Sequence, residues 1–311
     1  MSHIYEALQR AEAERKSGAQ AVATPEDPGP QSPAFSTAVP PVAALVPDVL
    51  TPADGFVASP LDPSFLSDVQ RRPWNPSLEK LPALERGGAG VEQFRSLRSR
   101  LQEFRDLRSL KTVLISSGLP QEGKSFIAVN LAINLARHKS SKVLLIDGDM
   151  RCSSLHHYLG SEFHPGLPDY LSGKATLQEV MQCPEDAKDR DPAMNAVLNN
   201  IAFIPGGDGG DLAADLSASK RFDELLTTVA PYFDWIIVDS PPVLLVSDAV
   251  NLARACDAVL LVARSGVTTF PDAQRAQQEL KASNIIGFVL NAVDKPPMSG
   301  SYYYRYENKK D

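Results

Sequence analysis

Six short runs of apolar, mostly β-branched residues constrain the fold of this chain more than any other feature of its sequence. Longer segments with a helical period of apolar residues lie between them. A continuously apolar run of this length is typical of a parallel strand that crossover helices cover on both faces. The sequence therefore predicts an α/β fold with a doubly wound, mostly parallel sheet and helices on both faces. The predicted strands are residues 112–116, 143–147, 201–204, 235–239, 258–263 and 286–291.

A glycine-rich segment, Gly118-Leu-Pro-Gln-Glu-Gly-Lys-Ser125, follows the first predicted strand and opens a predicted helix over residues 126–137. It fits the pattern GxxxxGK[ST], in which backbone N–H groups and a helix N-terminus cradle nucleotide phosphates. In this pattern Lys124 neutralises β- and γ-phosphate charge and Ser125 holds Mg²⁺. The alternative, a glycine-rich turn without a ligand, is disfavoured because the segment joins a strand to a helix. The segment predicts ATP and Mg²⁺ as cofactors.

Carboxylates mark the ends of two further predicted strands. Asp147 ends one strand and is followed by Asp149 and Arg151, and Asp239 ends the other. The carboxyl ends of parallel strands meet at the same end of a sheet, so the three acids are expected beside the γ-phosphate. A single acid in such a place is often only a loop cap. Three of them favour a functional site.

The rest of the chain divides by composition. Residues 17–84 carry about half of the 25 prolines and no helical or alternating period, which predicts a disordered linker because little surface can be buried to offset ordering entropy. The domain is expected over residues 85–297, and a tyrosine-rich tail over 298–311. Residues 1–16 are expected to form a short amphipathic docking helix; a terminal helix without a partner is the alternative.

Charge and cysteine usage bound the function further. A net charge of -7 argues against sequence-independent nucleic-acid binding, which needs a basic face. Cys152, Cys183 and Cys256 share no metal-like or disulfide-like spacing, which suits a reducing cytosol. The sequence contains neither a signal peptide nor a long apolar span. We therefore expect a cytoplasmic protein that reaches the inner membrane only through a partner.

The segments GLPQEGKS, VLLIDGDMR and WIIVDSPP resemble the Walker A, Walker A′ and Walker B motifs of bacterial tyrosine kinases, which are related to partition and septum-site ATPases. The resemblance covers about residues 85–306, and the opening MSHIYEALQRAEAERK looks like that of stand-alone cytoplasmic members. It implies an ATP-dependent tyrosine autokinase that regulates capsule or exopolysaccharide synthesis and export. It also implies that Asp147 is the base, while Asp149 and Asp239 act on the metal side.

The same resemblance implies partners and modification sites. A helix over residues 90–105 is similar to the helix through which such kinases form rings, with Glu92, Arg95 and Arg98 as interface residues; a solvated face is the alternative. The other implied partners are a membrane-embedded chain-length or export protein and a tyrosine phosphatase. The expected autophosphorylation sites are Tyr302, Tyr303, Tyr304 and Tyr306.

The expected site residues fall into three sets. Lys124, Asp147, Asp149 and Asp239 form the catalytic set, and Ser125, Asp149 and Asp239 form the metal set. The family resemblance also includes Asn291 and Asp294, at the end of the last predicted strand, where the base could be read. The full nucleotide-binding set is Gly118, Gln121, Glu122, Gly123, Lys124, Ser125, Phe126, Arg151, Asn291 and Asp294.

Some features depart from the family pattern. Cys152 stands where a basic residue followed by proline is frequent, and residues 205–210 lack a proline-rich stretch often present there. A hydrolytic switch of the partition or septum type is an alternative function, but that subclass has lysine at the position of Leu119. A nucleotide-binding scaffold without transfer is a further alternative that the sequence leaves open.

Overall fold

All six predicted apolar runs form strands in the computed structural model, which describes residues 65–85, 87–138 and 141–293. Each strand agrees with its predicted run to within one residue at either end. Branched side chains favour this outcome because they pack well on both faces of a pleated sheet. The strands are β2 (Thr112–Ser117), β3 (Val143–Asp147), β5 (Ile201–Ile204), β6 (Trp235–Asp239), β7 (Ala258–Arg264) and β8 (Ile285–Asn291).

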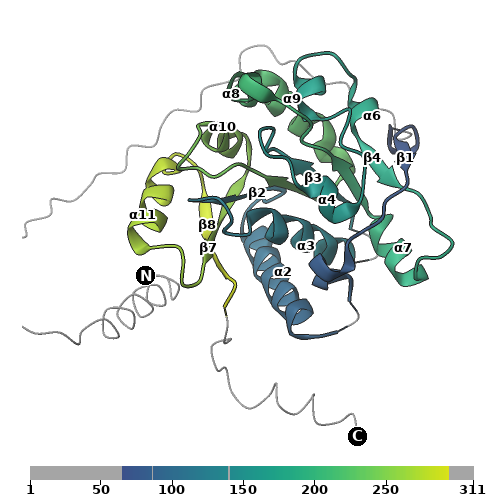
Figure 1. Ribbon diagram of the computed structural model, residues 1–311, viewed down its shortest axis with the longest axis horizontal. Helices are drawn as coiled ribbons and strands as arrows, with labels where there is room; N and C mark the ends of the chain where they lie inside the picture. Colours follow the sequence, from purple (N-terminus) through teal and green to yellow (C-terminus); the bar gives the residue numbers. More distant parts are fainter. Residues whose placement is uncertain (1–64, 86, 139–140, 294–311) are drawn as a thin grey trace, which may run out of the picture. The chain divides into compact units, whose positions relative to one another are not determined.

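The strands of the described chain form one eight-stranded sheet in the order β1-β4-β5-β3-β6-β2-β7-β8 (Figure 1). Two short strands that the sequence pattern did not predict, β1 (Gln70–Arg72) and β4 (Gln182–Pro184), extend one side of it. All pairings are parallel except that of β4 with β5. The predicted fold class is confirmed. The carboxyl ends of β3, β6 and β2 lie next to one another in the middle of the sheet.

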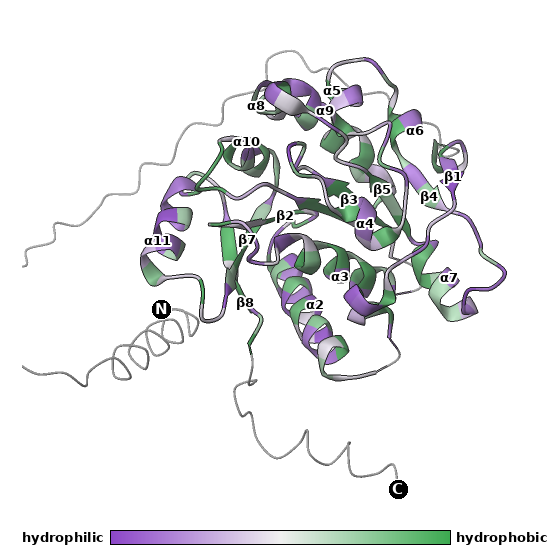
Figure 2. Ribbon diagram, in the orientation of Figure 1, coloured by the Kyte–Doolittle hydropathy of each residue, from purple (hydrophilic) through white to green (hydrophobic). Residues whose placement is uncertain are grey.

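Two hydrophobic cores fill the two faces of the sheet. Alternate residues of β3 show the division: Leu145 belongs to the core that contains α2 and α3, whereas Leu144 belongs to the core that contains α9 and α10. Figure 2 shows mostly hydrophobic strands, with hydrophilic residues on the helices and loops. The helices are α2 (Ala89–Leu107), α3 (Lys124–Ala136), α4 (Leu155–Leu159), α5 (Leu167–Leu171), α6 (Leu177–Val180), α7 (Pro192–Leu198), α8 (Ala213–Ser217), α9 (Lys220–Val229), α10 (Asp248–Ala255) and α11 (Phe270–Glu279).

The predicted linker over residues 17–84 is wrong from Phe65 onward, and the domain begins before its predicted start at residue 85. Residues 65–84, here called the strap, form η1 (Phe65–Ser67), β1, η2 (Leu78–Lys80) and η3 (Pro82–Leu84). Their isolated apolar side chains enter the two cores, so these side chains do bury surface. The sequence pattern did not predict this, because the buried residues of the strap follow neither a helical nor an alternating period and are divided between the two cores.

Side chains of the domain hold the main chain of the strap. On α3, Asn130 accepts a hydrogen bond from the Ala83 N–H at 3.0 Å and donates one to the Lys80 carbonyl at 3.2 Å. Arg137 donates to the Ala83 carbonyl at 2.8 Å. These bonds satisfy backbone groups at the end of η2 and in the first turn of η3 that have no partner within those short helices. The strap is therefore fixed by polar contacts as well as by burial.

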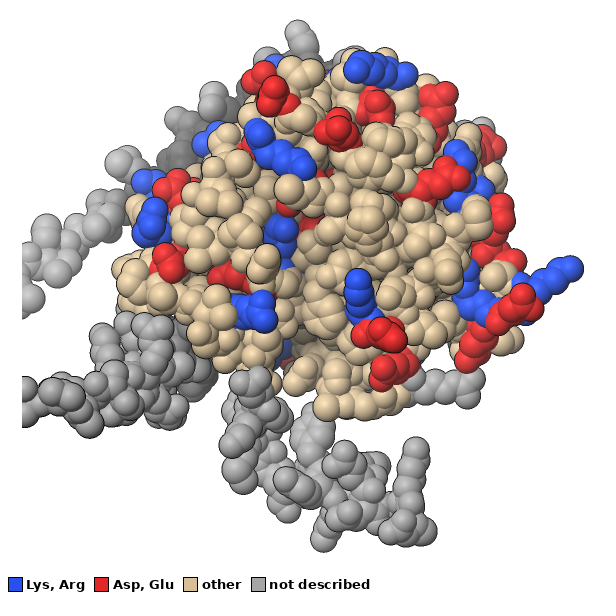
Figure 3. All heavy atoms as spheres, in the orientation of Figure 1, with Lys and Arg blue, Asp and Glu red and all other residues tan. Residues whose placement is uncertain are grey.

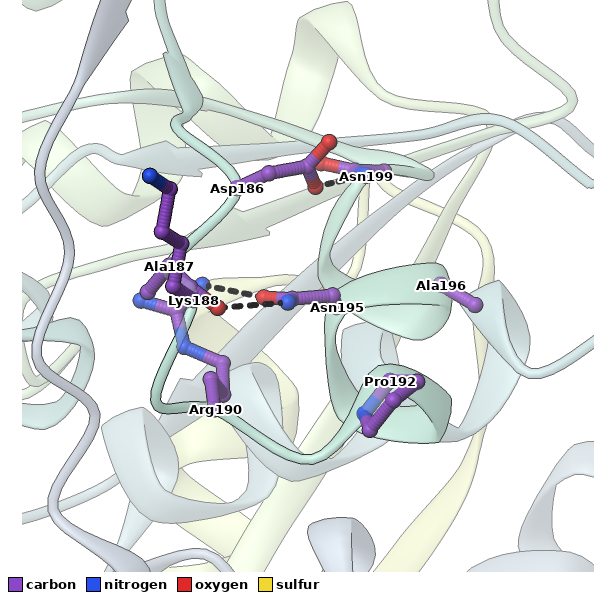
Figure 4. A pocket seen from close by; sticks show the side chains of 8 residues that line it. All are labelled: Asp186, Ala187, Lys188, Arg190, Pro192, Asn195, Ala196 and Asn199. Carbon is purple, nitrogen blue, oxygen red and sulfur yellow. Dashed lines mark hydrogen bonds between the residues drawn. The ribbon is translucent and has the colours of Figure 1, made fainter.

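A surface pocket of about 420 Å³ lies beside α7 (Figure 4). Its side chains bond to one another and to the strap: Arg190 donates to Asn195 at 3.0 Å and also to the carbonyl of Trp74. Asn199 donates to Asp186 at 2.6 Å. The side chains that line the pocket therefore connect the loop before α7 to α7 and to the strap.

Several predictions lie outside the described residues. These are the docking helix over residues 1–16, the linker over 17–64, Asp294, and the tail with its four tyrosines. Within the described ranges, no helix is both long enough and apolar enough to cross a bilayer. On the face shown in Figure 3, basic and acidic side chains are interspersed.

Trp74 provides a test of the strap. Its side chain is 3% exposed and meets Phe203 of β5 edge to face, with ring centroids 6.2 Å apart. Trp74→Ala should lower the free energy of unfolding by about 3–5 kcal/mol in urea titrations. Leu78→Ala, on the same strap but with Leu78 52% exposed, is the control and should change it by less than about 0.5 kcal/mol. If Trp74→Ala lowers the free energy of unfolding as little as Leu78→Ala does, the strap does not contribute to the core.

Candidate active site

The glycine-rich segment forms the turn between β2 and α3, as its position in the sequence predicts. Gly123 precedes the helix in a left-handed conformation with φ 93°, which a residue with a side chain adopts only with strain. Lys124 and Ser125 are the first two residues of α3. The free N–H groups and the dipole at this helix N-terminus point toward the end of β2, where an anion is favoured.

Strand register brings two of the predicted acids side by side. Asp147 and Asp239 are paired at the ends of the adjacent parallel strands β3 and β6, and Ile115 of β2 is the other neighbour of Asp239. Gly148 then passes so close that a Cβ at this position would lie 2.6 Å from the Asp239 carbonyl. Only glycine fits here, and the close approach lets Asp149 follow within the same site.

Lys124 is the cation of this cluster. Its Nζ lies 3.3 Å from Oδ2 of Asp149, and both side chains are largely buried. Burial lowers the pKa of Lys124, but attraction by Asp239 and Asp149 outweighs it and the pKa is raised overall. The ammonium therefore stays charged, as phosphate neutralisation requires.

Asp147 is fully buried and already well supplied with donors. Its Oδ2 accepts hydrogen bonds from the Ser153 hydroxyl at 2.7 Å and from the N–H groups of Ser154 and Leu155 at 3.0 Å. Its Oδ1 accepts one longer bond, 3.2 Å, from the Asp149 N–H. Burial raises its pKa, although the bonds from Ser153, Leu155 and Ser154 oppose the shift. Oδ1 thus keeps acceptor capacity for a substrate proton.

Asp239 has the opposite character. Neither of its carboxylate oxygens has a hydrogen-bond partner within the described residues, although the side chain is fully buried. Burial raises its pKa to about 7, Asp147 and Asp149 add to the shift, and Lys124 and Ser125 oppose it. An orphaned buried carboxylate beside a hydroxyl fits a hard divalent cation. Across the described ranges, no group of three or more His, Cys, Asp and Glu side chains is arranged to hold a metal ion by itself.

Arg151 forms an ion pair with Asp248, and its predicted contact with the nucleotide stays a prediction. Its Nε donates to Oδ2 of Asp248 at 2.8 Å, and Asp248 is buried at the start of α10. The Cys152 N–H donates to Asp149 at 3.0 Å. Together these bonds hold the loop after β3 in shape. Asp248 was not predicted, since no local pattern links two residues this far apart in the chain.

Four other residues that were predicted to bind the nucleotide have contacts within the protein. The ring of Phe126 packs against Phe94 of α2, with centroids 5.9 Å apart. Gln121 offers its carbonyl to Arg264 at 3.1 Å, and the side chain of Glu122 is turned inward. Asn291 donates to the Glu122 carbonyl at 3.0 Å. The base-reading role of Asn291 stays a prediction.

The predicted interface residues lie together on α2. Glu92 and Arg95 form an ion pair with each other, and the Arg98 guanidinium donates to the Asn134 carbonyl of α3 at 3.2 Å. Glu92 and Arg95 side chains are each 42% exposed. Their role between subunits stays a prediction.

Comparison with known proteins agrees with this geometry. A family model described as an AAA domain matches residues 120–271. Tyrosine-protein kinase CpsD of Streptococcus pneumoniae is 35% identical over 188 residues, which are 60% of this chain and 77% of CpsD. The kinase domain of the Escherichia coli tyrosine kinase ETK is similar with a TM-score of 0.60 at 30% identity, over 69% of this chain and 80% of that domain. This chain belongs to the bacterial tyrosine kinase family.

This chain covers only part of the length of some of its relatives. EpsB of Ralstonia solanacearum is 33% identical over 218 residues, which are 70% of this chain but 27% of EpsB. In family terms, the phosphate loop is Walker A, the loop after β3 is Walker A′, and the end of β6 is Walker B. The structure brings Lys124, Ser125, Asp147, Asp149 and Asp239 of these motifs together.

Asp239→Asn tests the metal side of the site. The pKa of Asp239 is raised from 3.8 to about 7, so the folded state favours the protonated acid and loses stability as the pH rises between these values. The neutral variant should therefore unfold about 2 °C or more above wild type at pH 8 without ligands, and no higher below pH 4. It should also lose the stabilisation that Mg²⁺ with ADP gives wild type. Thermal unfolding between pH 4 and 8 measures both effects.

Asp234→Asn is the matched control, since Asp234 stands before the other end of β6 and accepts a bond from the Lys142 N–H. It should show neither effect. The assigned role would be contradicted if, without ligands at pH 8, Asp239→Asn unfolds at a lower temperature than wild type. It would also be contradicted if Mg²⁺ with ADP stabilises the variant as much as wild type.

Proposed function

We propose that this chain transfers the γ-phosphoryl group of ATP to tyrosine hydroxyls, mainly in its own C-terminal tail, and thereby regulates the synthesis and export of a capsular or extracellular polysaccharide. The observation that carries the proposal is the cluster of Lys124, Asp149 and Asp239 around the Walker A loop. In a member of a tyrosine kinase family, such a cluster supports phosphoryl transfer, which asks a protein mainly for positioning and charge neutralisation.

Each residue has a distinct part in the proposed reaction. The N-terminus of α3 and Lys124 bind and orient the phosphates. Ser125, Asp149 and Asp239 would hold Mg²⁺, which when bound neutralises charge on the β- and γ-phosphates. Asp147 accepts the proton of the attacking tyrosine hydroxyl at Oδ1, and its raised pKa suits that task. The hydroxyl oxygen forms a bond to phosphorus as the bond to ADP breaks.

The remaining proposals concern assembly. We propose a ring homo-oligomer in which Glu92, Arg95 and Arg98 contact the neighbouring subunit, because forked guanidinium donors suit carboxylates on a partner. A membrane-embedded export protein would hold the kinase at the inner membrane through residues 1–16, and a tyrosine phosphatase would reverse the modification. The family resemblance of the sequence supports these partners.

Lys124→Met tests the transfer itself. Loss of the ammonium should reduce autophosphorylation about 100-fold or more, because phosphate charge is no longer neutralised. The measurement uses γ-labelled ATP with Mg²⁺ and maps label by mass spectrometry. Lys142→Met is the control, since Lys142 lies exposed before the other end of β3 and bonds to Asn200. Undiminished labelling of Lys124→Met would refute the proposal, and phosphate release without labelled tyrosine in wild type would favour a hydrolytic switch.

A mixing experiment tests transfer between subunits. One protein is Lys124→Met with its tail intact, and the other is truncated after Gly300, so that it is active but lacks the four acceptor tyrosines. We expect label on the tyrosines of the inactive protein, because only ten residues separate the end of β8 from Tyr302, too few for the tail to fold back readily into its own site. An unlabelled mixture, with wild type that labels itself at every dilution, would rule out transfer in trans.

A further inference from the structure

The outer side of the Walker A loop is held by side chains from two later segments of the chain. Glu122 is only 1% exposed, although it occupies a variable position of the loop pattern. One carboxylate oxygen accepts a hydrogen bond from the Leu119 N–H across the loop at 2.8 Å, and the other accepts one from the Thr268 hydroxyl. A buried carboxylate is costly unless donors satisfy it, so these contacts fix where Glu122 lies.

The direction of the Thr268 contact follows from its second bond. Thr268 lies between β7 and α11, and its hydroxyl oxygen accepts from the Arg264 N–H at 2.7 Å. The hydroxyl proton is therefore available to Glu122. The Arg264 side chain donates at 3.1 Å to the Gln121 carbonyl, so the same connection holds the loop at two consecutive residues.

Asn291, the last residue of β8, supplies the third contact. Its amide donates to the Glu122 carbonyl at 3.0 Å. The amide also lies directly over Gly123, where an added Cβ would be 2.0 Å from Nδ2. A side chain at position 123 would displace the amide from the Glu122 carbonyl, so the contact depends on glycine there.

Backbone strain is concentrated at this junction. Within the described residues, positive φ angles of non-glycine residues occur at Gln121, 61°, and Ala292, 54°. One precedes Glu122 and the other follows Asn291, so both flank the same hydrogen bond. Strained residues of this kind persist only where surrounding contacts enforce them, and they gather at functional sites.

We propose that Glu122, Thr268 and Asn291 form a latch that holds the Walker A loop in its phosphate-binding shape before any ligand arrives. The latch residues are positioning residues, since their contacts are with the loop. Without the latch, Gln121 can relax and the loop N–H groups lose their common direction. The binding of any polyphosphate is then weakened, whether or not it carries a base. The proposal rests on the proposed function only in that the loop must bind phosphate.

The test uses two probes, tripolyphosphate and ADP, each with Mg²⁺, in titration calorimetry on the full chain. Thr268→Val removes the hydroxyl at nearly constant volume and should lower the affinity for both probes about tenfold. Thr268→Ser should restore both to within about twofold of wild type. In autophosphorylation assays the loss of Thr268→Val should appear in KM for ATP more than in kcat. Thr227→Val, which removes an exposed hydroxyl bonded to the Asp223 carbonyl, is the matched control.

Asn291→Leu separates the latch from base recognition. If Asn291 is a latch residue, the substitution should weaken the binding of tripolyphosphate as much as that of ADP. If Asn291 reads the base, only the binding of ADP should weaken, and this result would overturn the role given to Asn291. Glu122→Gln should also weaken both probes, which keeps the proposal testable if one variant folds poorly. Wild-type affinity of Thr268→Val for both probes would refute the latch and leave the phosphate site intact. If wild type binds neither probe, the phosphate site and the proposed function both fail.

Discussion

The attraction between Lys124 and three buried carboxylates is the interaction on which the site depends. Asp147, Asp149 and Asp239 meet at the ends of two adjacent strands, where like charges in a poorly solvated place repel strongly. Burial of Asp239, together with repulsion by Asp147 and Asp149, outweighs the attraction of Lys124, so the pKa of Asp239 remains raised to about 7. Parallel pairing of β3 with β6 imposes the arrangement, and the sheet can hold it because two cores surround those strands.

The two paired acids differ because their neighbours differ. Asp147 receives a side-chain hydroxyl and three backbone N–H groups from the loop that follows it. Asp239 is followed by Ser240 and a proline pair, and within the described residues this following loop supplies no hydrogen bond to its oxygens. Asp147 therefore organises the loop that follows it, whereas Asp239 is the carboxylate that we propose for the metal. Similar side chains at equivalent strand ends thus acquire different chemistry from the loops that leave them.

Local patterns predicted the parts of the structure that local forces decide. The strands follow from continuous apolar runs, and the phosphate loop follows from its glycines between a strand and a helix. The strap was missed because Trp74 and its other core residues follow no regular period and are divided between the cores on the two faces of the sheet. The ion pair of Arg151 with Asp248 of α10 was not predicted either, and the nucleotide role of Arg151 stays a prediction. Thr268 and Asn291 could not be connected to Glu122 either, since only the order of strands β2, β7 and β8 brings them together.

The charge balance of the site bears on the order in which ligands enter. With Lys124 against Asp147, Asp149 and Asp239, the ligand-free site carries excess negative charge whenever Asp239 is ionised. A nucleotide triphosphate alone would add to that excess, while a divalent cation alone would lack most of its oxygen ligands. Under the proposed function, entry of metal and nucleotide as one complex would avoid both penalties, because the cation would reach Asp239 as the phosphates reach Lys124 and the N-terminus of α3. A phosphate loop held in shape beforehand suits such an entry, since the ligand then needs no free energy to order its own binding site.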